Sequence, residues 1–325
     1  MSNYYDIKGQ KVQNLASDPS PVQDGQVWYN TTSNAAKFEG YVSSSSWATG
    51  GAMNTARRQV AGFGESPTTA VVVCGQNPPA LANTEEYSGT SWANVTANPQ
   101  VRVKPFGTGT LTAGLVGGGE SGPSSGTNSG EYDGTSWTNS ATIPLTMYDS
   151  TGIGPIAAGV VVHGPQSPNT AVLLYAAGGT WTTGTSSPSF IGSGSAGGTE
   201  AAGIFTAMVP GDVTTSYEYA SGTWTAGGAL NQARNRAASG AQASQAQTLV
   251  FGGNIADATV KASTELYDGT CWSVQADMNT ARRGLGGAGS TSTSALAFAG
   301  YTGSDQAATE EFTGAGPATK TITTS

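Results

Sequence analysis

The sequence predicts an all-β fold of repeated four-stranded units, a β-propeller, and two observations carry this prediction. Tryptophan recurs at intervals of 43 to 48 residues, the length of one propeller blade, at Trp47, Trp92, Trp137, Trp181, Trp224 and Trp272. The hexapeptide Met-Asn-Thr-Ala-Arg-Arg at residues 53–58 returns unchanged at residues 278–283, 225 residues or five periods of 45 later. Because both signals share one phase, we expect a single closed array that begins near residue 37.

Each unit contains four strand-like pieces. The first is rich in Gly and Ala, as in residues 284–289, so that inner strands can converge around an axis. The second is an apolar run that ends in glycine, as in residues 295–300, and suits a strand covered on both faces. The third alternates polar and aromatic residues, as in residues 84–87, and is expected to be half exposed. The fourth opens with the tryptophan, after a hairpin turn such as Asp133-Gly134.

We expect six blades. Five intervals between tryptophans account for five units, and the 53 residues after Trp272 supply three strands of a sixth. Residues 37–47, whose Trp47 matches the phase of the repeat, compete to close that unit with residues 320–324, which alternate like an edge strand. We favour Trp47, with the C-terminal segment outside the ring.

Two recurring features have a structural and a functional interpretation. A tryptophan at a fixed offset from a hairpin favours packing between blades over a row of sugar-binding platforms. The Asn-Thr-Ala-Arg connection, echoed as Asn231-Gln232-Ala233-Arg234, favours a link between blades over a ligand site. Its guanidinium is expected to bind loop carbonyls or a neighbouring carboxylate.

The order of an apolar run, Gly252-Gly253, Tyr267, Trp272 and Met-Asn-x-x-Arg at residues 278–282 resembles a kelch repeat. The strings at residues 132–137 and 53–57 further resemble those of kelch-like proteins of tailed, particularly marine, bacteriophages. This resemblance covers residues 37–325. It implies a six-bladed kelch-type β-propeller that serves as a virion structural protein on a tail, a fibre or the capsid.

Residues 1–36 break the repeat and are expected to form a short extended arm with a hairpin. Residues 25–34 resemble a hairpin found near the start of phage tail-fibre and tail-associated proteins. The resemblance implies docking to other virion proteins or an oligomer contact, with candidate partner-binding residues Tyr4, Tyr5, Ile7, Val12 and Leu15. The alternative is a disordered leader followed by one extra hairpin.

Composition narrows the function. The net charge is −8 and basic residues never exceed a pair, so nucleic acid is not an expected ligand. The first residues lack an apolar core of signal-peptide length, and no apolar stretch is long enough to span a membrane. We therefore expect synthesis in the host cytoplasm, location in the virion and no membrane insertion. Cys74 and Cys271 are expected to be buried free thiols.

The residues offer little catalytic chemistry. A lone His163 within an apolar run indicates a core histidine, and no metal site, cofactor or catalytic residue is expected. Adjacent pairs such as Glu85-Glu86 recur with the repeat, which favours structure over glycosidase chemistry. Binding to a neutral surface glycan or a protein is expected in the variable loops at residues 76–83, 120–129 and 254–263. The alternatives to a non-enzymatic virion protein are a carbohydrate-active propeller enzyme and a cellular kelch-type adaptor.

Overall fold

The described residues form seven four-stranded sheets, joined by turns and by the short 3₁₀ helix η2 (Gln245–Gln247). The structure is a computed structural model. It describes residues 12–20, 26–42, 44–120, 126–164, 169–176, 178–192, 194–206, 213–240, 244–255 and 259–321. Contacts divide the chain into two compact units, Ser46–Thr313 and a smaller one formed by Met1–Ser45 with Gly314–Ser325.

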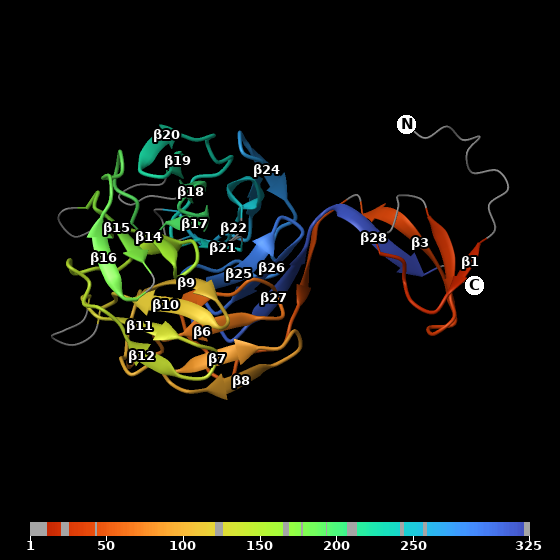
Figure 1. Cartoon of the computed structure of the whole chain (residues 1–325), viewed down its shortest axis with the longest axis horizontal. Helices are drawn as coiled ribbons and strands as arrows, with labels where there is room; N and C mark the ends of the chain where they lie inside the picture. The colour runs from red at the N-terminus through yellow and green to blue at the C-terminus, as the bar shows by residue number, and fades with distance from the viewer. Residues whose placement is uncertain are drawn as a thin grey trace. The chain divides into compact units, whose positions relative to one another are not determined.

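The larger unit holds six of the sheets, which Figure 1 shows arranged around a common centre. Three sheets consist of β5 (Ala61–Phe63), β6 (Ala70–Val73), β7 (Thr84–Tyr87) and β8 (Trp92–Val95); β9 (Phe106–Thr110), β10 (Ala113–Gly117), β11 (Ser129–Tyr132) and β12 (Trp137–Asn139); and β13 (Thr151–Ile153), β14 (Ala158–Val162), β15 (Val172–Ala176) and β16 (Thr180–Thr183). The other three consist of β17 (Ser195–Gly198), β18 (Gly203–Thr206), β19 (Ser216–Ala220) and β20 (Thr223–Ala226); β21 (Ala238–Ser239), β22 (Leu249–Phe251), β23 (Thr264–Tyr267) and β24 (Trp272–Gln275); and β25 (Gly286–Thr291), β26 (Ser294–Phe298), β27 (Thr309–Thr313) and β4 (Ser46–Thr49). All neighbouring strands in these six sheets pair antiparallel.

The first strands of the six sheets form a closed inner ring, because each contacts the next and β25 contacts β5. Glycine makes this convergence possible: a Cβ at Gly287 would lie 2.1 Å from the carbonyl oxygen of Ser239 on the adjacent strand. The second strands form the core, and all four residues of β6 are fully buried. Both features agree with the sequence pattern.

The third strands are more buried than the sequence pattern predicts. The expectation of a half-exposed strand is wrong for β7, where three of four residues are buried. The same holds for β23. The alternating pattern is misleading because the connection that enters the sheet covers the polar side chain, as described below for Glu85.

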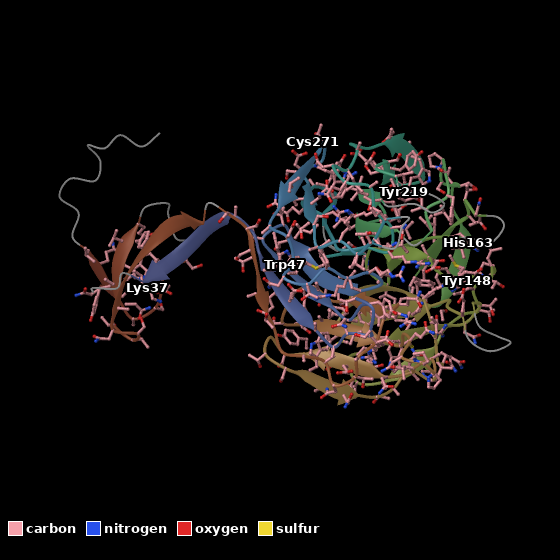
Figure 2. The ribbon with its side chains drawn as sticks, turned by 180° about the vertical axis from the view of Figure 1, so that it is seen from behind. Lys37, Trp47, Tyr148, His163, Tyr219 and Cys271 are labelled. Carbon is pink, nitrogen blue, oxygen red and sulfur yellow. The ribbon has the colours of Figure 1, made fainter. Side chains whose placement is uncertain are left out.

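The last sheet joins distant parts of the chain. β4 pairs with β27, with Trp47 opposite Phe312 and Ser46 opposite Thr313. Trp47 also packs edge-on against Phe251 of the preceding sheet, with ring centroids 5.1 Å apart (Figure 2). The expectation that Trp47 closes this sheet, with the C-terminal segment elsewhere, is confirmed.

The smaller unit is a sheet with strand order β1 (Gln13–Leu15), β2 (Val27–Asn30), β3 (Ala35–Val42) and β28 (Gly316–Thr321). β2 and β3 form the expected hairpin, but the expected boundary between residues 36 and 37 does not match the contacts. Residues 37–42 belong to this unit because β3 pairs with both β2 and β28. A sheet of both chain ends therefore takes the place of a short extended arm. Trp28 is fully buried in it, and its indole N–H donates to Asp18 Oδ1 at 3.0 Å.

Replacing Trp47 with alanine should lower the free energy of unfolding by about 3–5 kcal/mol, because the change leaves a cavity in the sheet that closes the ring. Chemical denaturation of the full chain measures this effect. Trp224→Ala is the matched control, since Trp224 holds the same repeat position but is only half buried. An equal or smaller loss for Trp47→Ala would contradict its closing role.

Candidate functional site

Three buried ion pairs link neighbouring sheets. Each joins an arginine of the connection entering a sheet to a glutamate on the third strand of that sheet: Arg57–Glu85 at 2.9 Å, Arg234–Glu265 at 2.6 Å and Arg282–Glu310 at 2.6 Å. Burial lowers the pKa of each guanidinium, and the facing carboxylate opposes that shift. The predicted structural role of the Asn-Thr-Ala-Arg connection is confirmed.

The Arg57 connection shows how this link works. Glu85 accepts hydrogen bonds from the backbone and side chain of Asn54 and from the backbone of Thr55, as well as from Arg57. The same connection donates from Met53 N to the Ala307 carbonyl of the preceding sheet at 2.8 Å. Glu85 therefore binds a connection that is also hydrogen-bonded to the preceding sheet.

The recurring tryptophans also join neighbouring sheets. Each indole N–H donates to the preceding sheet or to the connection leaving it, as from Trp92 to Thr309 Oγ1 at 2.9 Å and from Trp181 to the Ala141 carbonyl at 3.2 Å. Trp92 packs edge-on against Phe298 of the preceding sheet at 5.1 Å. The predicted packing role is confirmed, and the alternative of six sugar platforms has no support in this geometry.

A second carboxylate series accepts hydrogen bonds from tyrosines across the same interfaces. The phenol O–H groups donate from Tyr87 to Glu311, Tyr132 to Glu86, Tyr175 to Glu131 and Tyr267 to Glu218. Burial, reinforced by the glutamate, raises the pKa of Tyr87, Tyr175 and Tyr267 to about 12. The pKa of Tyr132 is raised for the same reasons.

The remaining two interfaces lack this hydrogen bond between a tyrosine and a glutamate. Phe312 stands at the tyrosine position and packs with Leu266 at the glutamate position, so both polar groups are absent together. Leu174 likewise stands at a glutamate position, but its partner in the same apolar cluster is Tyr219. Tyr219 is fully buried, and its hydroxyl makes no hydrogen bond within the described residues. Burial raises the pKa of this phenol as well.

The first strands enclose an axial cavity of about 110 Å³. Small side chains and backbone of all six strands line it, including Gly62, Gly107, Gly152, Ser195, Ser239 and Gly287. It opens to a mouth of about 90 Å³ with which it shares Val60, Pro105 and Ala237.

Residues with a left-handed backbone surround the mouth, one before each of the first strands β5, β9, β13, β21 and β25. Gln59, Lys104, Asp149, Arg236 and Gly284 have φ between 50° and 59°. Their backbones form a chain of hydrogen bonds from sheet to sheet: Asp149 N to Lys104 O, Lys104 N to Gln59 O, Gln59 N to Gly284 O and Gly284 N to Arg236 O. Four of these positions therefore present a full side chain at one end of the axis.

Of the basic residues at the mouth and in the recess beside it, Lys104 and Arg58 form ion pairs, whereas Arg236 and Arg283 form none among the described residues. Lys104 contacts Glu120 and Asp149, both at 3.2 Å. Although burial opposes the change, these carboxylates raise the pKa of Lys104. A recess of about 30 Å³ beside the mouth is lined by Arg58, Gln59, Arg236, Arg283, Gly284 and Tyr301. Arg58 pairs with Asp305 at 2.5 Å, and the guanidiniums of Arg58 and Arg283 lie 4.6 and 5.4 Å from the Tyr301 ring centre.

The candidate partner-binding residues lie in or near the smaller unit. Tyr4, Tyr5 and Ile7 fall outside the described residues. Val12 is 55% exposed, whereas Leu15 lies in β1 and its carbonyl accepts a hydrogen bond from Thr31 N at 2.8 Å. The structure thus places two of the five, and their partner-binding role stays a prediction.

The residues around the mouth were missed by sequence reasoning. The repeat assigns a role to the first arginine of the doublets Arg57-Arg58 and Arg282-Arg283 but none to the second. The second arginine is the sequence signal for the recess: Arg58 and Arg283 directly follow the buried Arg57 and Arg282, and both line the recess.

The remaining candidates for chemistry are structural. His163 is buried, with Nδ1 3.0 Å from the Gly164 carbonyl and Nε2 2.9 Å from the Thr146 carbonyl, as expected for a core histidine.

Both cysteines are free, and burial raises the pKa of Cys74 to about 12. The expectation of a buried Cys271 is wrong, because it occupies an exposed turn position beside Asp268, whose carboxylate raises the thiol pKa (Figure 2). Within the described residues, no group of three His, Cys, Asp or Glu side chains is placed to hold a metal ion.

Comparison with known proteins identifies the fold. No family model and no curated protein matches the chain. A solved structure titled "Structure of YjhT" is similar, with 11% identity and a TM-score of 0.64 over 83% of this chain and 99% of that chain. At this identity the likeness concerns the fold alone, and it supports a β-propeller-like all-β architecture. The described part of the chain contains no helix that is long and apolar enough to cross a membrane.

The unmatched Tyr219 yields a comparison of two variants. Tyr132→Phe should lose about 1.5–3 kcal/mol of unfolding free energy, because it removes a hydrogen bond to the Glu86 carboxylate. Tyr219→Phe should be neutral or stabilising, because it removes a buried hydroxyl that has no partner. Chemical denaturation distinguishes them, and equal destabilisation by both would contradict this account of the interfaces.

The tyrosines also predict a loss of stability at high pH. Their pKa in the folded chain is about 12 for Tyr87, Tyr175 and Tyr267, above the ordinary value of 10. The unfolded chain therefore loses these protons first, so stability is complete below pH 10 and falls as the pH rises from 10 to 12. Melting temperatures across this range should show the fall, and Tyr267→Phe should make it shallower. A flat profile up to pH 12 would refute the prediction.

Proposed function

We propose that residues 46–313 form a six-bladed kelch-type β-propeller that serves as a non-enzymatic virion protein of a tailed bacteriophage. It is carried on a tail, a fibre or the capsid surface, where it contributes to assembly or to recognition of the host. The kelch and phage resemblance of the repeated strings supports this assignment. The ring of six sheets closed by β4 supports the number of blades.

One observation carries the non-enzymatic proposal. The repeated carboxylates are engaged between sheets, with Glu85, Glu265 and Glu310 bonded to buried arginines and Glu86 and Glu311 to tyrosines. A glycosidase needs carboxylates that are free to donate a proton and to attack or activate water. The residues that recur most strongly are thus occupied in holding the scaffold together.

The smaller unit is the proposed attachment module. It gathers strands from both chain ends and connects to the ring through two segments, beside Ser46 and Thr313. Because those residues pair in one sheet, attachment needs no strand from any other sheet. Other virion proteins are the proposed partners of this unit, with Val12 among its exposed apolar residues.

Two alternatives make different predictions. A carbohydrate-active propeller enzyme would hydrolyse a host polysaccharide, and detection of such activity in the purified chain would overturn the proposal. A cellular kelch-type adaptor would recruit host proteins in uninfected cells and would be absent from purified particles. Electron microscopy of intact particles locates the chain and separates tail, fibre and capsid positions.

Removing the smaller unit should separate folding from assembly. A chain of residues 46–313 retains all six sheets and should melt cooperatively with a β-type circular dichroism spectrum. In a reconstitution assay with particles that lack the protein, it should fail to incorporate, whereas the full chain incorporates. Normal incorporation of the folded truncated chain would refute the attachment role.

A further inference from the structure

The seven arginines of the chain divide into those whose side chains have a polar partner in the described part of the chain and those whose side chains have none there. Arg57, Arg234 and Arg282 pair with buried glutamates, Arg102 donates to the carbonyls of Gly118 and Asn128, and Arg58 pairs with Asp305. Within the described residues, Arg236 and Arg283 alone have no ion pair or side-chain hydrogen bond, and Arg236 Nε is also shielded from solvent. Both unpaired guanidiniums line the same recess.

This concentration of positive charge is costly without a counterion. Arg58, Arg236 and Arg283 share a cavity of about 30 Å³ in a chain whose net charge is −8, and Asp305 neutralises only one of them. Like charges in a confined space repel, and a buried guanidinium N–H without an acceptor is destabilising. An oxyanion would relieve both costs.

The shape of the recess also favours a ligand. Gly284 stands where the other described mouth positions carry Gln59, Lys104, Asp149 and Arg236, so one side chain is missing from the circle. The gap adjoins Gln59 and Arg236, which line both the recess and the mouth. A site of this size holds a headgroup of a few atoms, since one water needs about 10–15 Å³. The body of the ligand would extend into the mouth, whose walls include Val60, Pro105 and Leu285.

We propose that this recess binds the carboxylate or phosphate group of a small molecule through the guanidiniums of Arg236 and Arg283. The planar fork of N–H donors matches two oxygens of such a group, and Tyr301 holds the Arg283 guanidinium by a cation–π contact. Carboxylate and phosphate share this chemistry. The site is separate from the variable loops expected to contact neutral glycans, and it stands whether or not the chain belongs to a virion.

Titration calorimetry on the full chain tests the site, with inorganic phosphate and succinate as probes at low, constant ionic strength, because salt screens partly exposed charges. We expect at least one probe to bind with a Kd of about 1 mM or below. The probe that binds identifies phosphate or carboxylate as the preferred group. Absence of heat from both would overturn the proposal.

Four variants locate the binding. Arg236→Gln and Arg283→Gln should each weaken it by about tenfold or more, because each removes a charged donor. Gly284→Gln should abolish it by filling the gap, and it fits sterically, since a Cβ there lies 3.4 Å from Gln59 Cγ and Gln59 has a similar φ of 53°. Lys261→Gln removes a positive charge outside the recess and the mouth and should leave binding unchanged.

Circular dichroism and melting temperature establish that each variant is folded. If Gly284→Gln does not fold, Arg236→Lys replaces it, because this change keeps the charge and removes the fork of donors. Binding that survives in a chain carrying both Arg236→Gln and Arg283→Gln would overturn the proposal. Binding that survives in folded Gly284→Gln, or that is lost equally in Lys261→Gln, would place the anion elsewhere and would also overturn it.

Discussion

The pairing of β4 with β27 is the constraint on which the ring depends, because it joins the first sheet-forming residues of the larger unit to the last. Five sheets are contiguous in sequence, whereas this one unites residues 46–49 with residues 286–313. Circular closure buries the uncovered sheet face that an open array of packed sheets would present at each end. Trp47 adds hydrogen bonds to Thr264 and Ala276, so the closing strand is bound to two sheets at once.

The interfaces between sheets explain how a chain with 10% charged residues uses its charges. A buried ion pair gains little over a well-packed apolar pair, but removal of one partner leaves a charge that is very costly to bury. Glu85 avoids that cost by accepting four hydrogen bonds from one connection. Such saturated carboxylates hold each connection in position against its sheet. At Phe312 and Leu266 both polar groups are absent, so neither is left buried without a partner.

The sequence predicts features that repeat and misses those that occur once. The period of the tryptophans predicts the four-stranded unit, the buried second strand and the role of Trp47 in closure. The pairing of β3 with β28 leaves no such signal, because the strands lie almost a chain length apart and neither follows the repeat. The second arginines of the doublets are a signal for Arg58 and Arg283, but their convergence with Arg236 is not predictable, because these residues belong to different repeats and meet only in the folded ring.

The double connection beside Ser46 and Thr313 has a mechanical consequence. A force applied through the smaller unit enters the ring at two paired residues of one sheet and pulls β4 and β27 in the same direction. These strands therefore do not slide past each other, and the load passes to the hydrogen bonds of β27 with β26, which resist in shear. A single tether at Ser46 would instead load β4 alone, which is the edge strand of this sheet and is held by β27 only. The topology thus spreads such a load over two strands of the sheet that closes the ring.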